Sequence, residues 1–505
     1  MGFSQPIPDN AACTPVRAVT GCALRRATSA ACFLLLTACA VQPLPPKLPE
    51  QALGLPASFS SSGSAPVSQR WWRSFGDPQL AELVELALHS SPDLQATYWR
   101  LQQAAAAADQ ARSGFWPRLS GSLENTEQRR ASSNGFDFSG GENEGNSWSG
   151  TLAAAYEVDL WGRVRSGARA AEAARLAQEE NLNTAALTLA AEVSATWMQL
   201  EEQWGQIRLL EQQLENNRKT LRALELRFGS GVSAAADVLQ QRQLVQQSIQ
   251  ELDQSRANLE VLRVQLAALL GVAPQNLPAA ALQYDRLPAL PALPETGIPA
   301  KLLLRRPDVK RAERDLLQGH YLARQAWAER LPSLSLSLFF SGGGKSISDI
   351  AEDWLLNLSA ALEGVIFDGG ALSAAKRQQQ AVEQERWAAF RNTVTRALSE
   401  VEQALVNEDA IAVRISHLEE RVQLADLITV RQRRAYSLGA VDFLNVLSAT
   451  NNQQSLERQL LTARRELLEN RVTLYRALSG GLQAGDLPQP PAEELDVYRS
   501  EDPDV

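Results

Sequence analysis

The positions of the prolines limit what this chain can fold into more than any other feature. No proline occurs between Pro117 and Pro274, and none occurs between Pro332 and Pro488. Proline breaks a helix in its interior, so segments of this length without proline allow helices far longer than those of an average protein. Each segment begins and ends on proline, which indicates two copies of one structural unit.

Short motifs recur in the same order in the two copies. SSPDLQA is similar to RRPDVKR, FWPRLSGSL to RLPSLSLSL, and RFGSGVSAAADVL to AYSLGAVDFLNVL. The corresponding positions are Pro92 and Pro307, Asp93 and Asp308, Pro117 and Pro332, Gly162 and the Gly369-Gly370 pair, and Gly231 and Gly439. Landmarks that keep their order in this way predict an internal duplication.

Two pairs of strands are expected, at about residues 117–160 and 332–367, because the hydrophobic period there is two. Leucine alternates with serine in PSLSLSLFF, and the same alternation runs through SWSGTLAAAYEVDLW and WLLNLSAALEGVIFD. Such strands are typical of outer-membrane barrels, but four per chain are too few to close one. The residues predicted to face lipid are Trp148, Leu152, Tyr156, Leu334, Leu336, Leu338, Leu358 and Ile366, and those predicted to face the lumen are Ser149, Glu157, Asn357 and Glu363.

The stretch FFSGGGKSIS, residues 339–348, contains Gly-Lys-Ser and so resembles the end of a phosphate-binding loop. That loop needs another glycine five positions before the Gly-Lys pair, where this chain has Phe339. A nucleotide site is therefore disfavoured. The stretch is instead predicted to be an extracellular loop between the third and fourth strands, in which the glycines allow a tight turn. Its counterpart, about residues 127–146, is predicted to be longer.

Each strand pair is followed by a helix of exceptional length. One helix is expected from Arg163 to Phe228, a turn at GSGVS, and a return helix to about Leu270. The second copy repeats this from Ala371 through SLGAV to Leu478. Alanine, leucine and valine occupy one face of these helices and glutamine, arginine and glutamate the other, as in packed helical hairpins.

The N-terminus has the features of a bacterial lipoprotein signal. The four cysteines all lie within the first 39 residues, so a disulfide framework for the rest of the chain is excluded. Arginines precede the apolar run AACFLLLTACA, which ends in Leu36-Thr37-Ala38-Cys39. This pattern predicts cleavage before Cys39 and lipidation of its thiol. The alternative is an ordinary signal peptide with a chance cysteine.

The rest of the composition indicates no catalytic chemistry. The three histidines are scattered, and none lies at metal-ligand spacing or near a candidate nucleophile. We therefore expect no enzymatic activity, no metal and no cofactor. A formal net charge of −9 gives no electrostatic reason to expect a nucleic acid partner.

Taken together, the motifs WWRSFGDPQL, YEVDLWGRVR, LLLRRPDVKRAE and VIFDGG and the two hairpin turns resemble the outer-membrane efflux protein family of the TolC type. The resemblance covers about residues 71–482, and the N-terminal cysteine signal favours the lipoprotein branch that serves resistance-nodulation-division pumps. It implies an α+β membrane protein with internal duplication. Three chains, each with four strands, would form one outer-membrane β-barrel that continues into a long periplasmic α-helical barrel.

The implied function is the outer-membrane exit duct of a tripartite efflux pump, which conducts drugs or other small molecules passively. The implied partners are two further copies of the chain, outer-membrane lipid, a periplasmic adaptor protein and a proton-driven inner-membrane transporter. An exit duct for type I protein secretion shares the family and remains an alternative. A lipid-anchored coiled-coil scaffold would explain the helices but not the amphipathic strands.

The resemblance also assigns roles to the hairpin turns. It implies that a hydrogen bond between Tyr436 and Asp237 helps to close the periplasmic aperture, near Asp442 and Asn445. A basic family position corresponds to Val441 here and an acidic one to Asn445, so fewer contacts are expected to hold this aperture shut. The implied adaptor-docking residues are Gly231, Val232, Ser233, Gly439, Ala440 and Val441. The alternative is that Asp237 only caps the start of its helix.

The chain is accordingly divided into six regions. These are a signal peptide (1–38), a lipidated linker (39–70), a first repeat (71–272), a Pro-rich equatorial connection (273–298), a second repeat (299–480) and a C-terminal tail (481–505).

Overall fold

The computed structural model describes residues 55–129, 144–299, 301 and 305–482. Every element described below belongs to one compact unit, Pro49–Val505.

Two runs of elements with nearly equal lengths follow one another along the chain. The first run is α3 (Pro92–Ser113), β1 (Arg118–Arg129), β2 (Glu144–Val158), α4 (Arg163–Gly229) and α5 (Ala235–Leu270). The second is α7 (Pro307–Ala328), β3 (Ser333–Gly344), β4 (Trp354–Glu363), α8 (Ala371–Ser437) and α9 (Phe443–Leu478). Helices α3 and α7 have 22 residues each, α4 and α8 have 67 each, and α5 and α9 have 36 each. The long helices begin and end within a residue or two of the positions predicted from sequence.

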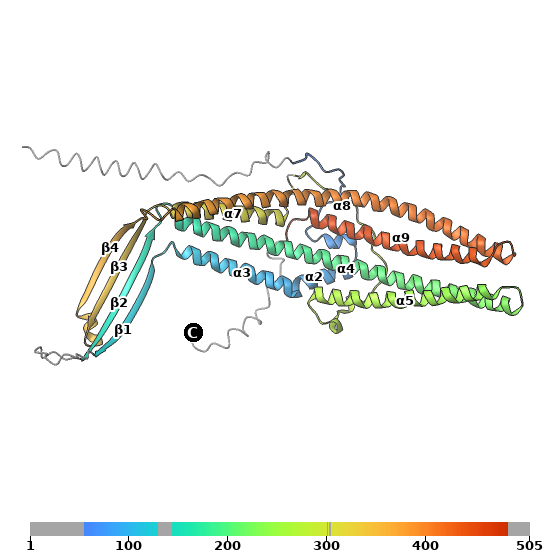
Figure 1. Ribbon diagram of the computed structural model, residues 1–505, viewed down its shortest axis with the longest axis horizontal. Helices are drawn as coiled ribbons and strands as arrows, with labels where there is room; N and C mark the ends of the chain where they lie inside the picture. The colour runs from blue at the N-terminus through green and yellow to red at the C-terminus, as the bar shows by residue number, and fades with distance from the viewer. Residues whose placement is uncertain (1–54, 130–143, 300, 302–304, 483–505) are drawn as a thin grey trace, which may run out of the picture. The chain divides into compact units, whose positions relative to one another are not determined.

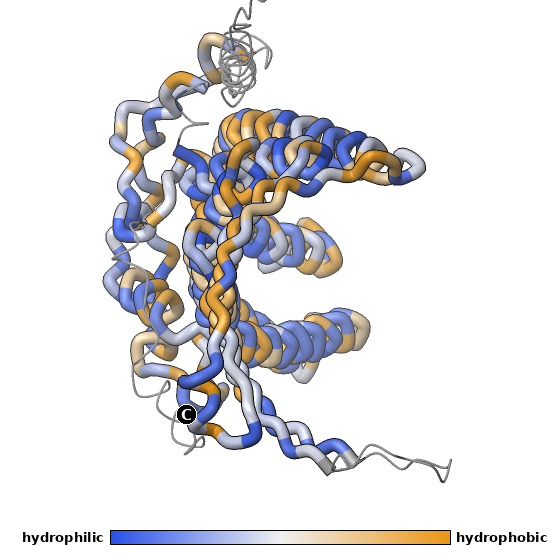
Figure 2. The backbone as a smooth tube through the Cα atoms, turned by 90° about the vertical axis from the view of Figure 1, so that its left-hand side faces the viewer, coloured by the Kyte–Doolittle hydropathy of each residue, from blue (hydrophilic) through white to orange (hydrophobic). Residues whose placement is uncertain are grey.

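The helices are arranged side by side in the same order in both runs. Helices α3 and α5 follow one another alongside α4, and α7 and α9 follow one another alongside α8 (Figure 1). Helix α4 also packs against α7 and α9, which joins the two hairpins and leaves α5 and α8 as their outer helices. Hydrophilic and hydrophobic residues are interspersed along all of these helices (Figure 2). Among the described helices, none combines the length and the apolar composition that crossing a bilayer requires.

The four strands form one antiparallel sheet in the order β1-β2-β3-β4. Leu152 of β2 lies opposite Phe340 of β3, and Leu338 of β3 lies opposite Leu358 of β4. Directly paired residues point to the same face of a sheet, so the apolar positions of successive strands gather on one side. Serine, threonine, glutamate and asparagine dominate the other side, as the period of two predicted.

In the single chain, the apolar face of the sheet is exposed. Leu119 of β1 is 74% exposed and Leu358 of β4 is 76% exposed, although both belong to this face. The outer edges of β1 and β4 have no partner strand within the described residues. Exposed apolar residues and free strand edges are costly in water, so this sheet requires further contacts.

Two predictions about the strands are wrong. Ile366 lies beyond β4, which ends at Glu363, so the alternation does not apply to it. The glycines of FFSGGG are part of β3 and not of a loop. The connection to β4 is instead the short helix η5 (Ile347–Ala351), which folds back onto the end of the strand. A Cβ at Gly342 would lie 2.1 Å from the Ile350 carbonyl oxygen, so glycine here permits close contact and not a turn.

The WWRSFGDPQL motif connects the N-terminal helices to both hairpins. It forms the short helix η2 (Trp71–Phe75) and the start of α2 (Pro78–Ser90). The buried ring of Trp71 stacks on Tyr475 of α9 at 5.8 Å between centroids. Asp77 caps α2 through two backbone N–H groups and also accepts the indole N–H of Trp197 of α4 at 2.7 Å.

The Pro-rich connection lies against the same core. It contains the short helices η3 (Pro274–Asn276) and η4 (Ala279–Leu282). The Tyr284 ring packs 5.7 Å from that of Trp197, and the Pro291 carbonyl accepts a hydrogen bond from Arg471 of α9. Pro294 pairs with Ala65, so the connection is also attached to the N-terminal segment.

Candidate functional site

Each long hairpin turns at a glycine in the left-handed region of backbone conformation. Gly231 has φ 74° and Gly439 has φ 72°. In each turn the N–H after the glycine donates to a carbonyl five residues earlier, Val232 to Arg227 and Ala440 to Ala435, both at 2.9 Å. These bonds define Schellman motifs, in which glycine is favoured because other residues are strained at positive φ.

A hydrogen-bonded group connects the two turns within one chain. The Tyr436 hydroxyl of α8 donates to Asp237 Oδ2 of α5 at 3.1 Å, and it lies 3.1 Å from the Ser233 hydroxyl. The Arg227 guanidinium lies 5.0 Å from the centre of the Tyr436 ring and donates to Ser233 at 3.3 Å. The structure therefore brings together the tyrosine and aspartate that the sequence singled out.

A small apolar cluster packs against this hydrogen-bonded group. It contains Leu224 of α4, Val238 of α5, and Phe443 and Val446 of α9. The Tyr436 ring packs edge-on against Phe443 at 5.4 Å between centroids. Because the cluster draws on both hairpins, the Tyr436 hydroxyl is held by packing as well as by hydrogen bonds.

Asp237 does not act as the N-cap of α5. The N-cap is Ala234, which makes no side-chain capping bond, and Asp237 lies within the first helical turn. A carboxylate there interacts favourably with the helix dipole. The side-chain contact of Asp237 is nevertheless with Tyr436, so helix capping does not explain its position.

The other residues singled out near the aperture make fewer contacts. Asp442 is the exposed N-cap of α9 and makes no side-chain capping bond. The backbone N–H of Asn445 donates to the Asp442 carbonyl at 3.1 Å, and its side chain is exposed. Val232, at one hairpin end, is 64% exposed, and Leu438 at the other is 76% exposed. The hairpin ends thus present apolar side chains outward.

Sequence reasoning missed two members of this group, Arg227 and Phe443. Arg227 lies in the last turn of α4, where a basic residue complements the helix dipole, so its position alone did not reveal a contact with Tyr436. Phe443 begins α9, and its apolar character would have predicted burial but not its partner.

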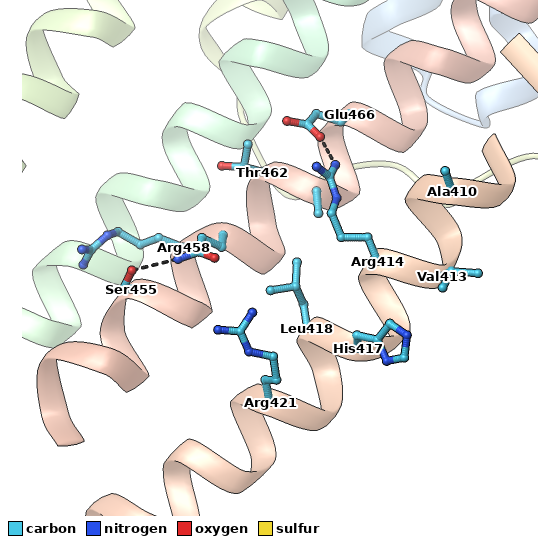
Figure 3. Close-up of a pocket in the computed structure, with 12 residues that line it drawn as sticks. Ala410, Val413, Arg414, His417, Leu418, Arg421, Ser455, Arg458, Thr462 and Glu466 are labelled. Atoms are coloured by element: carbon cyan, nitrogen blue, oxygen red, sulfur yellow. Dashed lines mark hydrogen bonds and ion pairs between the residues drawn. The ribbon is translucent and has the colours of Figure 1, made fainter. Parts of the chain in front are cut away.

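A separate groove of about 590 Å³ lies between α8 and α9 (Figure 3). Arg414 on its α8 side forms an ion pair with Glu466 of α9, and His417 and Arg421 lie along the same α8 wall. The groove contains no pairing of a nucleophile with a base. Across the described part of the chain, no three His, Cys, Asp or Glu side chains are grouped so that they could hold a metal ion.

Several of the sequence predictions fall wholly or partly outside the described residues. They include the signal peptide (1–38), the lipidation site Cys39, the linker up to residue 54, most of the predicted loop at residues 127–146, and the C-terminal tail from residue 483. The ends of the predicted loop were assigned wrongly, because Glu127 belongs to β1 and Asn146 to β2.

Comparison with known proteins places these features in a family. Residues 83–272 and 298–480 match the family model described as outer membrane efflux protein. The chain is 31% identical over 458 residues to the pyoverdine export outer membrane protein OpmQ of Pseudomonas putida, covering 89% of this chain and 96% of that protein. It is 25% identical to the cation efflux system protein CusC of Escherichia coli K12, covering 89% and 97%. The solved structure of the outer-membrane channel OprN superposes with a TM-score of 0.79 at 28% identity, covering 88% of this chain and 99% of that one.

Proposed function

The chain belongs to the outer membrane efflux protein family and is an outer-membrane efflux channel, and we propose that it is the passive exit duct of a tripartite pump. A periplasmic adaptor and a proton-driven inner-membrane transporter would supply substrate and energy. The observation that carries this proposal is the sheet, which has a largely apolar face and, within the described residues, no partner strand at the outer edges of β1 and β4. No reaction is required of the chain itself.

Closure of the sheet requires further copies of the chain. Unpaired strand edges are not stable in lipid, because their backbone groups have no hydrogen-bond partners there. We propose a homotrimer in which β4 of each copy pairs with β1 of the next. The outer helices support the same assembly. Val261 and Val264 of α5 are exposed, as are Val406 and Val413 of α8, so both borders offer apolar side chains to a neighbouring copy.

The two runs of elements are proposed to be an internal duplication. Their equal helix lengths and the matching turns at Gly231 and Gly439 support this origin. With the duplication, three chains would place six similar hairpins around one axis. The periplasmic tunnel would then be built from helices in near-equivalent surroundings, which favours a closed ring over an open array.

The hairpin ends are proposed to form the periplasmic aperture and the adaptor-docking surface. The bond between Tyr436 and Asp237 would hold the two hairpins of one copy together, and Asp442 and Asn445 would lie beside it. The exposed apolar residues at the turns, such as Val232 and Leu438, suit contact with an adaptor. Opening then requires separating the hairpins at this point.

Lipidation at Cys39 is proposed to add a membrane anchor to the barrel. A diacylglycerol linked to this thiol carries two acyl chains, which suffice for stable membrane anchoring, and it would add to the barrel's own hold. Labelled palmitate should enter the wild-type chain and not the Cys39→Ala variant. Equal incorporation into both would exclude Cys39 as the modified residue.

Small organic molecules are the proposed cargo. The relatives carry names that refer to pyoverdine export, cation efflux and toluene efflux, so the family serves several substrates. The chain has only two methionines, Met1 and Met198, which gives no methionine series for soft metal ions.

Conductance tests the duct directly. Purified protein incorporated into planar lipid bilayers should produce large, long-lived single-channel currents, whereas a coiled-coil scaffold would produce none. Deletion of the coding sequence should sensitise cells to small toxic compounds and leave protein secretion unchanged. Loss of a secreted protein instead would favour the type I secretion alternative.

A further inference from the structure

Two junctions between helices occupy corresponding places in the two halves. Helix α5 ends where α3 begins, alongside α4, and α9 ends where α7 begins, alongside α8 (Figure 1). The residue at each junction precedes a proline and is the N-cap of the following helix, Ser91 before α3 and Arg306 before α7. Their backbone angles are nearly equal, with φ −63° and ψ 121° at Ser91 and φ −65° and ψ 126° at Arg306.

The second junction is filled by a guanidinium group. The Arg306 side chain is 8% exposed and donates to Asp308 at 2.6 Å and to Glu400 at 2.8 Å. It also donates to the backbone carbonyls of Ala477 at 3.2 Å and Ala397 at 3.4 Å. Two carboxylates and two carbonyl oxygens therefore surround one cation, which is the coordination that a planar guanidinium favours.

Three of these four acceptors have counterparts at the first junction, where no cation among the described residues pairs with them. Asp93 is the second residue of α3, as Asp308 is of α7. Glu192 lies 29 residues after the start of α4, as Glu400 does after the start of α8. The next-to-last residue of α5 is Leu269, as Ala477 is of α9.

A groove occupies the place of the missing side chain. It has a volume of about 670 Å³, and Ser91, Asp93, Glu192 and Leu269 all line it. No side chain among the described residues forms an ion pair with Asp93 or Glu192. The carbonyl of Leu269 lies in the last turn of α5, where helix carbonyls have no partner within the helix. Acceptors that bind a guanidinium in one half are thus left open in the other.

We propose that the groove beside Ser91 binds a guanidinium group, held by the carboxylates of Asp93 and Glu192 and the carbonyl of Leu269. The group belongs either to a small guanidinium-bearing solute or to an arginine of a neighbouring copy of the chain. The competing explanation is that Asp93 only complements the dipole of α3 and that Glu192 is only solvated. That explanation does not account for the arrangement around Arg306, where the same acceptors converge on one cation.

Calorimetric titration of the purified full-length protein with N-methylguanidinium tests the solute directly. The wild type should bind one molecule per chain, with a dissociation constant on the order of 1 mM because both carboxylates are exposed. The Asp93→Asn/Glu192→Gln variant should bind at least about tenfold more weakly, since each charge-assisted hydrogen bond contributes this much. Glu385→Gln, which alters an exposed glutamate of α8, is the matched control and should bind as the wild type does.

Exchanging the two junction residues sharpens the test. Ser91→Arg should fill the groove with its own guanidinium and abolish binding. Arg306→Ser should open a second site, so that two molecules bind per chain and the probe raises the melting temperature of this variant more than that of the wild type. Measurable and equal binding by the wild type, Ser91→Arg and the doubly neutralised variant would overturn the proposal.

Assembly measurements separate the two sources of the guanidinium. If a neighbouring arginine occupies the groove, the wild-type oligomer binds no probe. The doubly neutralised variant and Ser91→Arg then dissociate in detergent at lower temperature than the wild type, because both lose that contact. If neither binding nor the dissociation temperature changes in any variant, the groove is not a guanidinium site.

Discussion

The two halves of this chain have the same element lengths but different buried polar groups. In the second half Arg471 of α9 is almost fully buried and pairs with Glu408 of α8, and Arg306 is surrounded by acceptors. At the corresponding positions of the first half, Arg263 is partly exposed over the Tyr284 ring, and Leu200 replaces the glutamate. Element lengths and backbone geometry are therefore common to the halves, whereas buried arginines that bind carboxylates occur, within the described residues, only in the second half.

The first half has a buried acid with no cationic partner among the described residues. Glu201 of α4 is 3% exposed, and one of its carboxylate oxygens has no hydrogen-bond partner. Its counterpart in the second half, Asp409, is exposed. Burying an unpaired acid is costly. The buried Glu201 of the first half bears this cost, whereas the buried Glu408 of the second half is paired with Arg471. Substitutions at corresponding positions of the two halves test this difference.

The largest effect is expected from Arg471→Leu. Removing this cation leaves Glu408 buried without a partner, which should lower the free energy of unfolding by about 3–5 kcal/mol. The matched change in the first half, Arg263→Leu, removes a partly exposed cation and should cost about 0–1 kcal/mol. Denaturant titration of the purified proteins measures both.

A double variant provides the control for Arg471. Arg471→Leu/Glu408→Leu gives the second half the apolar residue that Leu200 supplies in the first, and it should recover most of the lost stability. If the double variant is as unstable as Arg471→Leu, the cost does not arise from an uncompensated charge.

The sheet should respond equally in both halves, because its apolar face is shared. Leu152→Arg in β2 and Leu336→Arg in β3 should each cost roughly 2–4 kcal/mol near the middle of the bilayer. Thr151→Arg and Ser335→Arg lie on the opposite face and should cost much less. Yield of folded barrel in the outer membrane reports the difference, and equal tolerance on both faces would contradict the facing assigned here.

Glu201 should make stability depend on pH. Burial raises its pKa to about 7 from the ordinary 4.5, with the nearby Asp77 and Asp285 carboxylates adding to the rise and the Asp285 N–H opposing it. When the pH lies between these two pKa values, Glu201 is protonated in the folded chain and ionised in the unfolded chain. The free energy of unfolding should therefore fall by roughly 3 kcal/mol as pH rises through this range.

Glu201→Gln should remove this dependence. Melting temperatures of the wild type should decline from pH 5 to about pH 7, while those of Glu201→Gln stay flat over the range. The matched variant Asp409→Asn changes an exposed acid and should leave the wild-type slope in place. A wild-type melting temperature that rises over this range would contradict the assignment.

The smallest effect concerns the hairpin ends. Tyr436 corresponds to Phe228 in the first half, so Tyr436→Phe makes the halves alike at this position. The change removes the bond to Asp237 and should cost about 0.5–1.5 kcal/mol per chain. If the bond helps to close the aperture, single-channel conductance should rise.

Asp237→Ala should raise the conductance as Tyr436→Phe does, because both remove the same bond. Asp409→Asn, which changes an exposed acid of α8 away from the turns, is the control and should leave the conductance as it is. Unchanged currents in both Tyr436→Phe and Asp237→Ala would exclude a role in closing the aperture.

Much of the fold could be predicted because its signals are local. Helices α4 and α8 end within two residues of Gly231 and Gly439. The positive φ of each glycine terminates the helix locally. The facing of Leu336 and Leu338 follows from the period of two within one strand. Such features depend on neighbours in sequence, and local rules describe them well.

The candidate site was predicted in part. The pairing of Tyr436 with Asp237 came from resemblance and agrees with the contact within the chain. The environment of that pair was not predictable, because Arg227 and Phe443 reach it from separate helices. Nothing in their local sequence distinguishes them from ordinary helix-end residues.

The sequence was enough to predict the long helices, their turning points, the two-faced strands and the correspondence between the halves. The three-dimensional packing was needed to see that Gly342 lies in a strand beneath η5, that Arg471 meets Glu408, and that Arg306 fills a junction which Ser91 leaves open. The two groups of features differ in how far apart along the chain the interacting residues lie. Helix ends and strand faces arise from interactions between near neighbours in the chain, whereas close backbone contacts and buried charges depend on residues that only packing brings together.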